Sequence, residues 1–498
     1  MQDAYGALVE RFRQLARIDH ALTFLNWDQL VMMPLAGNDS RAAAIAELTA
    51  MHHELLTAPV VDDLLQTART QALATPEQHS LREMERQWQR AVCLPASLVK
   101  AQSLAGSQCE HAWRQQRRDN DWQGFVANFR EVVRLAREEA RLRQAVDTDT
   151  FATPYDALLD LYCTGDDSAF IGQVFATLKA ELPTLLAEVL ERQQPAPSLA
   201  GTYPLAAQMA LCEAVMRCLG FDFSAGRLDV SMHPFSTGDR GDHRITTRFR
   251  EDDFADALQA TAHETGHAGY EAGLPRQWDG LPVGQARNLC LHESQSLLFE
   301  NQLFLARPFV AFLTPMIHKH LAGSRHLRED ELWRALIRVG PSLIRTEADE
   351  VTYPLHVVLR FEIEKALINA EIEPDDIPEL WDLKMRQYLG LSTAGNFRDG
   401  CLQDIHWTDG SFGYFPSYTM GALNAAQLFA AIRRHCPDWR EFLGQGDVAF
   451  VRQWLAGQVW SRGSTMESQD IMRQATGEGT NPRYFLDHLR ARYLHQQY

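Results

Sequence analysis

At 498 residues, with 45% hydrophobic and 23% charged residues, the sequence has the composition of a soluble globular protein with a large buried core. Its formal net charge of −17 argues against nucleic-acid or anionic-membrane partners, because phosphate groups are bound by positive charge. No stretch approaches the ~20 consecutive apolar residues of a membrane span, and the segment 1–25 lacks the apolar core of a signal peptide.

Helical periodicity covers most of the chain, beginning with an amphipathic pattern in residues 1–25. Pro183 predicts a break or kink within one of the longer segments. The apolar spacing predicts further helices over 41–57, 60–73, 77–93, 125–146, 168–193, 204–219, 329–346, 353–371, 422–435 and 447–457.

One region favours strands. "RLDVSMHPFS" (227–236) and "HRITTRFRE" (243–251) are β-branched or alternating runs, separated by the Gly-rich loop 236–242. They predict a small antiparallel sheet. With no internal repeat and no convincing linker, the sequence predicts one mainly α-helical domain over 1–498. The eight cysteines contain no C-x-x-C pair, which indicates reduced thiols and a cytoplasmic protein.

The stretch "TAHETGHAGYEAGLP" (261–275) carries two histidines four residues apart. On a helix, His263 and His267 project from one face and can reach a single zinc ion, while Glu264 lies beside them and can hold the attacking water. The alternative is a pair of exposed helix histidines. The small residues Gly266 and Ala268 favour close packing over a solvated face.

A zinc site needs a third protein ligand. The metzincin class is excluded, because Tyr270 and Gly273 stand where it requires Gly and His. Glu271 continues the histidine face, but three ligands along eight residues would span about 12 Å of helix rise. The third ligand must therefore come from another element.

Residues 284–304 supply the candidates. Glu293 falls within an apolar arc, where a carboxylate is costly unless it is paired or metal-bound. This favours Glu293 as the ligand over His292, which points to the adjacent face. Glu300 shares the arc and is a weaker candidate or an outer partner of a ligand.

A series of motifs resembles the thermostable carboxypeptidase 1 family, which is family 32 of the metallopeptidases. The resemblance extends nearly from end to end and implies a mainly α, gluzincin-type fold with a deep cleft. The motifs are "HPF" (233–235), "DHRIT" (242–246), "HETGH" (263–267), "HESQ" (292–295), "IRTEAD" (344–349) and "GCLQDIHW" (400–407).

The resemblance implies that His263, His267 and Glu293 bind zinc, or cobalt as a substitute, and that Glu264 is the general base. It also implies release of single residues from peptides with a free C-terminus. Specificity would be broad, with C-terminal proline a poor substrate. A homodimer is expected.

Four further residues are candidates for contacting substrate. Tyr418, in a predicted loop, could stabilise the oxyanion, with His406 as a second candidate. Arg345 is the family-supported partner for the terminal carboxylate; otherwise it would pair with an acidic neighbour within "IRTEAD". His233 would border the cleft, and its strand could bind the substrate backbone.

Two other functions remain possible. A helical zinc oligo-endopeptidase would use the same ligands without an anchor for the C-terminus. A non-catalytic peptide-binding protein is disfavoured, because binding alone would not require Glu264.

Overall fold

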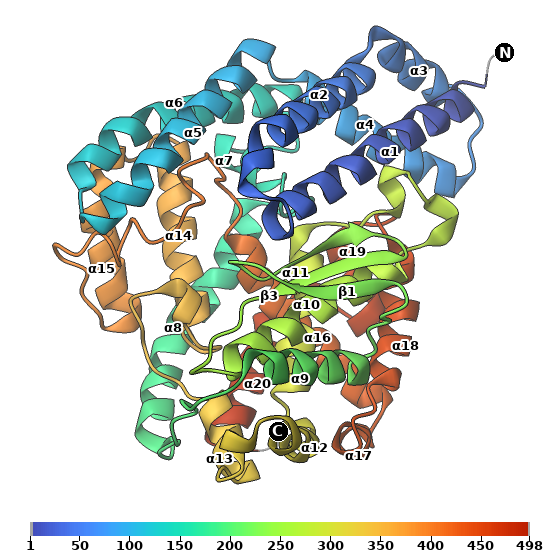
Figure 1. Ribbon diagram of the computed structural model, residues 1–498. Coiled ribbons are helices and arrows are strands. Elements are labelled where there is room, and N and C mark those ends of the chain that lie inside the picture. Colours follow the sequence, from blue (N-terminus) through green and yellow to red (C-terminus); the bar gives the residue numbers. More distant parts are fainter. Residues whose placement is uncertain (1–2, 497–498) are drawn as a thin grey trace.

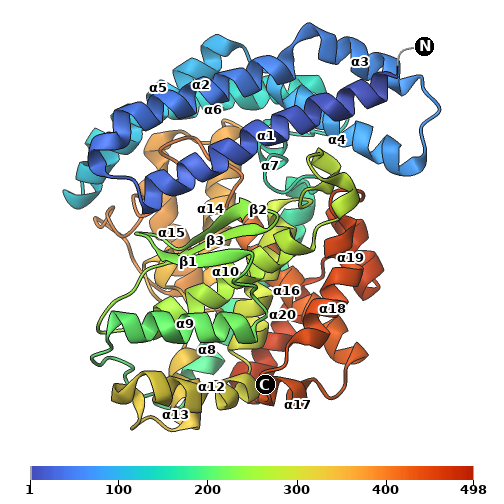
Figure 2. The ribbon, with the colours of Figure 1, turned by 45° about the vertical axis from the view of Figure 1, so that its right-hand side comes forward.

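The computed structural model describes residues 3–496, most of which are helical, as the sequence predicts (Figure 1). The N-terminal helices form a layer, blue to cyan, that lies over the rest of the protein in two views (Figures 1 and 2). Within this described range, no helix has both the length and the apolarity to cross a bilayer. The layer contains α1 (Ala4–Val31), α2 (Asn38–Thr57), α3 (Pro59–Arg69), α4 (Thr75–Val92), α5 (Ala96–Arg118) and α6 (Trp122–Val146).

The N-terminal layer has its own small apolar core, formed by side chains such as Leu8, Phe12 and Val61. Helix α6 instead faces a larger core. Asp121 caps its N-terminus by accepting a hydrogen bond from Gly124 N, and its apolar residues at helical spacing, including Phe125 and Phe129, are buried. Helix α6 is therefore one of the elements that join the layer to the body of the molecule.

The middle of the chain contains a small three-stranded sheet of order β1-β3-β2. Strand β1 pairs with β3 in parallel and β2 pairs with β3 antiparallel, so the sheet is mixed, not antiparallel throughout. The elements are α7 (Pro154–Leu159), α8 (Ser168–Arg192), α9 (Leu205–Cys218), β1 (Gly226–Val230), β2 (Phe235–Asp239), β3 (Asp242–Thr247), α10 (Ala255–Gly273) and α11 (Leu289–Leu297).

The mixed sheet arises because the loop predicted over 236–242 is largely strand β2. The chain leaves β1 after Val230, passes Pro234 and returns as β2. Pro cannot donate a ladder hydrogen bond, so Pro234 falls between strands. Only two residues then connect β2 to β3, and Gly241 there has φ +82°, which glycine adopts without strain.

A π-helix continues α11 and is followed by the C-terminal helices. The elements are the π-helix η4 (Leu298–Phe304), α12 (Arg307–His320), α13 (Glu329–Leu336), α14 (Tyr353–Ile368), α15 (Ile377–Leu389), α16 (Pro416–His435), α17 (Trp439–Gly444), α18 (Ala449–Gln458), α19 (Ser468–Thr476) and α20 (Pro482–Leu489), followed by the π-helix η9 (Arg490–Leu494).

One helix prediction was wrong in detail. The helix predicted over 329–346 ends at Leu336, ahead of Gly340 and Pro341, and Arg345 instead begins a short 3-10 turn, η6 (Arg345–Glu347). Pro183 lies inside α8 without ending it.

Glycines let the helices of the centre cross closely. A Cβ atom on Gly266 of α10 would lie 2.5 Å from the carbonyl oxygen of Gln295 on α11. A Cβ atom on Gly421 of α16 would lie 2.7 Å from the Cβ of Glu293. Neither distance tolerates a side chain, so α11 is held between α10 and α16 by close backbone contact.

Candidate metal centre

Helix α10 presents the two histidines of the "HETGH" motif. Its start is stabilised by Asp253, whose carboxylate accepts a 2.8 Å hydrogen bond from Ala255 N, one of the amides that lack a partner within the helix. His263 and His267 lie one turn apart, with ring centroids 4.9 Å from each other. Both rings therefore face the same side of the helix, as their spacing predicts.

Helix α11 brings Glu293 to these histidines. His263 Nε2 lies 3.7 Å from Glu293 Oε1, and His267 Nε2 lies 3.6 Å from Glu293 Oε2. Ligands of a tetrahedral zinc ion, each about 2.0–2.1 Å from the metal, are about 3.4 Å apart. Within residues 3–496, these three side chains form the one His/Cys/Asp/Glu cluster able to hold a metal ion, with ligand atoms within 4.8 Å of one another.

Glu264 is buried beside this cluster and lines the same cavity. Burial, reinforced by repulsion from Glu293 and Glu300, raises the pKa of Glu264 to about 7, against the lowering effect of His263. Burial likewise raises the pKa of Glu293. Within residues 3–496, the carboxylates of this cluster form ion pairs with histidines and with no arginine or lysine, which is an environment that a bound cation would stabilise.

The outer ring nitrogens of the two histidines contact different groups. His263 Nδ1 lies 2.7 Å from Glu300 Oε2, and the other oxygen of Glu300 accepts a 3.0 Å hydrogen bond from Gln259. Glu300 reaches this position from the π-helix η4, a type of helix that is frequent at functional sites. His267 Nδ1 instead lies 2.6 Å from His292 Nδ1.

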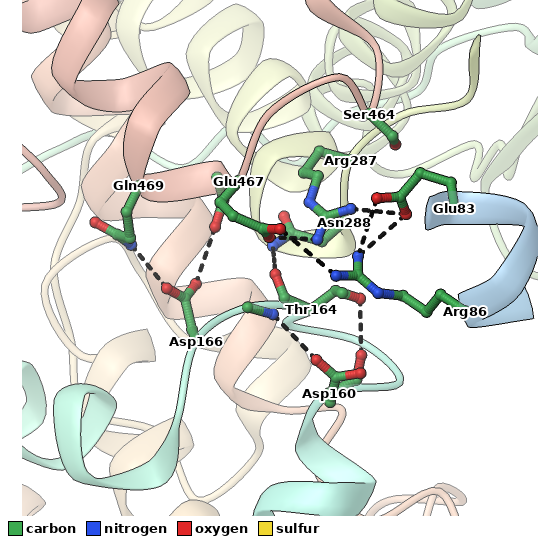
Figure 3. A network of polar contacts seen from close by, with 12 residues as sticks. Glu83, Arg86, Asp160, Thr164, Asp166, Arg287, Asn288, Ser464, Glu467 and Gln469 are labelled. Atoms are coloured by element: carbon green, nitrogen blue, oxygen red, sulfur yellow. Dashed lines mark hydrogen bonds and ion pairs between the residues drawn. The ribbon is translucent and has the colours of Figure 1, made fainter. Parts of the chain in front are cut away.

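A polar network fixes the start of α11, fewer than two helical turns before Glu293 (Figure 3). Asn288 caps the helix by accepting a 3.0 Å hydrogen bond from Leu291 N, and its amide donates to Thr164 O at 3.1 Å. The preceding Arg287 is buried and pairs with Glu83 of α4, at 3.0 Å, and with Glu467. These contacts connect the ligand-bearing helix to the N-terminal layer and to the C-terminal region.

A cavity of about 580 Å³ opens beside the three candidate ligands. One wall comes from Pro234, Phe235 and Ser236 of the sheet region. The lining also includes Tyr353, Tyr414 and Tyr418, whose hydroxyl groups can donate hydrogen bonds. The sequence interpretation missed Tyr353 and Tyr414. A tyrosine near a proline or glycine carries no signal that distinguishes a cavity wall from a packed core.

Tyr418 lies in the first turn of α16, so its predicted location in a loop was wrong. Pro416 is well suited to that first turn, because its missing N–H has no helical partner there. His406 contacts Tyr418, with Nε2 3.5 Å from the Tyr418 hydroxyl, and its ring packs in tilted contacts against Tyr414 and Phe415. Burial, followed in size by the positive charge of Arg345, lowers the pKa of His406 to about 4, so the neutral imidazole is favoured.

Arg345 is buried and engaged by protein groups. Its Nη2 donates to Asp404 at 2.8 Å and its Nη1 to the Tyr353 hydroxyl at 2.6 Å. The predicted alternative of a partner within "IRTEAD" was wrong, because that partner is Asp404. The cavity lining among the described residues includes Tyr353 and Tyr418 but not Arg345.

His233 is exposed and precedes the wall residues Pro234 and Phe235. Its backbone oxygen accepts a hydrogen bond from Ser231 Oγ, which shapes the turn between β1 and β2. Strand β2 is an edge strand, because the sheet order places it beside β3 alone. It therefore retains unpaired backbone groups next to the cavity.

The comparisons with known proteins agree along the whole chain. A family model described as "Carboxypeptidase Taq (M32) metallopeptidase" matches residues 7–493. Thermostable carboxypeptidase 1 of Thermus thermophilus is 35% identical over 501 residues, covering 98% of each chain. Carboxypeptidase 1 of Bacillus subtilis is 34% identical over 496 residues, covering 97% of each.

Solved structures show the same fold. Trypanosoma cruzi metallocarboxypeptidase 1 superposes with a TM-score of 0.96 at 38% identity, covering 99% of this chain and 100% of that one. A Pyrococcus furiosus carboxypeptidase gives a TM-score of 0.95 at 31% identity, with 99% of both chains covered. The chain therefore belongs to the M32 family of metallopeptidases and is a metallocarboxypeptidase, a peptide hydrolase that depends on a metal ion.

Proposed function

We propose that the protein uses zinc, with cobalt as a possible substitute, to release single amino acids from peptides with a free C-terminus. The observation that carries this proposal is the arrangement of His263, His267 and Glu293, whose facing atoms are 3.6–3.7 Å apart and fit a tetrahedral ion. A fourth position then remains for water, as in catalytic zinc sites. Zinc bound there would polarise the scissile carbonyl and lower the pKa of a water molecule.

Glu264 is the proposed general base. It directly follows His263 in α10 and lines the cavity beside the candidate ligands. From this position its carboxylate can accept the proton of the attacking water and return it to the leaving amine. Tyr418, which lines the same cavity, is the proposed donor to the developing oxyanion. His406 is 3.5 Å from the Tyr418 hydroxyl and would act through it.

The terminal carboxylate is proposed to bind at the Tyr353–Arg345 pair. Asp404 occupies Nε and Nη2 of Arg345, whereas Nη1 points to the hydroxyl of Tyr353 on the cavity wall. Tyr353 can donate its proton to a carboxylate while it accepts from Arg345, so the arginine's charge would reach the substrate through the phenol. The edge strand β2, after His233, would bind the substrate backbone by strand addition.

Broad side-chain specificity, poor cleavage before a C-terminal proline, a homodimer and a cytoplasmic location complete the proposal. The location is supported by free thiols at all eight cysteines within residues 3–496. The dimer rests on the resemblance of the sequence motifs to the family. Light scattering of the purified protein at several concentrations tests it, and a concentration-independent monomer mass would contradict it.

Mass spectrometry of a peptide ladder tests the reaction itself. A peptide with a blocked N-terminus should lose one residue at a time from its free C-terminus, and a chelator should stop this loss. The C-terminally amidated form of the same peptide should resist cleavage. Equal cleavage of both forms, at internal bonds, would instead identify an oligo-endopeptidase.

A further inference from the structure

The two histidines of the metal helix are supported in different ways. His263 Nδ1 contacts a carboxylate directly, at 2.7 Å from Glu300. His267 Nδ1 contacts another imidazole, at 2.6 Å from His292 Nδ1, and His292 Nε2 lies 2.7 Å from Oε1 of Glu271. The second arrangement is a chain of two rings that ends at a carboxylate.

Metal binding allows a single placement of protons along this chain. The Nε2 atom of His267 faces Glu293, so it must be unprotonated to act as a ligand. The neutral ring then carries its proton on Nδ1 and donates it to His292 Nδ1. A neutral His292 consequently carries its own proton on Nε2, where the Glu271 carboxylate accepts it. The reverse placement would put the proton of His267 in the position of the metal.

Helices α10 and α11 each contribute residues both to the proposed metal site and to the chain that ends at Glu271. Helix α10 provides His267 and, one turn later, Glu271, while α11 provides the ligand Glu293 and, immediately before it, His292. The close crossing at Gly266 brings the two helices near enough for ring-to-ring contact. The rings of His267 and His292 are 4.5 Å apart between centroids, and the Tyr270 ring also packs against His292, at 5.6 Å between centroids.

We propose that His292, held by Glu271, is a positioning residue that fixes the ring orientation and proton placement of His267 for metal binding. It contacts the ligand His267 and also lines the cavity, so its effect on the metal centre is measured by cobalt binding, which needs no substrate. Outer partners of this kind typically contribute 10- to 100-fold to metal affinity. The proposal rests on the proposed metal site, and the experiment below separates the two.

Cobalt titration of the metal-free protein provides the test, with affinity measured against a competing chelator and geometry read from the visible absorption of bound cobalt. His292→Ala should weaken cobalt binding by about 10- to 100-fold and alter the absorption bands, because His267 is free to rotate. His292→Gln should recover part of the affinity. Its amide oxygen can accept from His267 Nδ1 while its nitrogen donates to Glu271.

Glu271→Ala tests the far end of the chain without changing the cavity, because Glu271 is not among the described residues that line it. It should weaken cobalt binding less than His292→Ala does. The matched control is His318→Ala on α12. It removes a half-buried histidine whose ring is hydrogen-bonded to Leu327 O, and it should leave cobalt binding unchanged.

Unchanged affinity and absorption in both His292→Ala and Glu271→Ala, with cobalt bound by the wild type, would overturn the inference and leave the proposed function intact. Failure of the wild type to bind cobalt or zinc would overturn the proposed function, and the inference with it.

Discussion

The metal cluster and the Asp404 cluster both bury several charges, but they balance them differently. Asp404 lies between Arg345, at 2.8 Å, and Arg360, and these guanidinium groups hold the pKa of the Asp404 carboxyl well below its usual range despite its burial. Around the "HETGH" helix, burial instead raises the pKa values of Glu264 and Glu293, and within residues 3–496 the ion-pair partners of Glu293 are histidines, not arginine or lysine.

This difference distinguishes buried carboxylates that support the fold from those that we expect to support the reaction. A buried carboxylate that the protein has already neutralised with arginine contributes to a rigid scaffold, here the one behind Tyr353 and Tyr418. Buried carboxylates that lack an arginine or lysine partner cost free energy of folding, and a protein retains them where an external cation or a proton transfer requires them. The predictions below test this distinction.

The largest effect is expected from Glu264→Gln. The amide keeps the size of the side chain but cannot accept a proton, so kcat should fall by about 10²- to 10⁴-fold. Metal content, measured by elemental analysis, should remain at the wild-type level because Glu264 is not a proposed ligand. Turnover comparable to the wild type would contradict its role as the base.

A large loss of stability is expected from Asp404→Ala. This change leaves Arg345 and Arg360 buried without their counter-charge and should lower the free energy of unfolding by about 3–5 kcal/mol, measured with urea. The control is Asp375→Ala, whose exposed partner is Arg130; loss of that pair should cost at most about 1 kcal/mol. Equal effects of the two substitutions would show that the Asp404 cluster is not a structural core.

Removing the metal should lower the free energy of unfolding through the metal cluster, not through the Asp404 cluster. At a free zinc concentration 100 times Kd, binding stabilises the wild type by about 2.7 kcal/mol, which a chelator should remove. Glu293→Gln should lose this zinc-dependent stabilisation. Without metal, the variant should be no less stable than the metal-free wild type, because it removes a carboxylate whose charged form is disfavoured by burial, while His263 keeps its contact with Glu300. A marked destabilisation of the metal-free variant would contradict the comparison.

A smaller effect on stability is expected at Glu364, which is a buried carboxylate. Among the described residues, its hydrogen-bond donors are all neutral: the Tyr155 hydroxyl, the Trp407 ring and Gly413 N. Burial raises its pKa to about 7, against these donors. The folded state therefore holds the proton between about pH 4.5 and pH 7, and the resulting stability is lost as the pH rises through 7.

Glu364→Gln has no such proton to lose. Its deficit in unfolding free energy relative to the wild type should therefore shrink between pH 5 and pH 8, as measured by urea unfolding at each pH. A deficit that grows over this range would show that the carboxylate is stabilised in its charged form.

Local patterns in the sequence sufficed for most helices and for the candidate ligands. The i, i+4 spacing of His263 and His267, and the position of Glu293 within an apolar arc, depend on helix geometry alone. The helix predicted over 329–346 failed because its apolar spacing continues past Leu336, although Gly340 and Pro341 end the helix. Tyr418 was placed in a loop because glycines and prolines flank it, whereas Pro416 starts a helix.

The sequence did not predict the contacts between helices. The sequence pattern makes His292 an alternative metal ligand to Glu293, and helix rise excludes Glu271 as a ligand. Their contacts with each other and with His267 depend on the crossing of α10 and α11, which Gly266 makes possible but does not specify. Asp404 as the partner of Arg345 is likewise separated from it by 59 residues and could not be inferred from neighbouring charges.

Anomalous diffraction at the zinc absorption edge, from crystals of the zinc-loaded protein, tests the central claim most directly. The account predicts one strong peak between His263 Nε2, His267 Nε2 and the carboxylate of Glu293. A loaded crystal with no peak at this position, or with the ion bound away from Glu293, would contradict it.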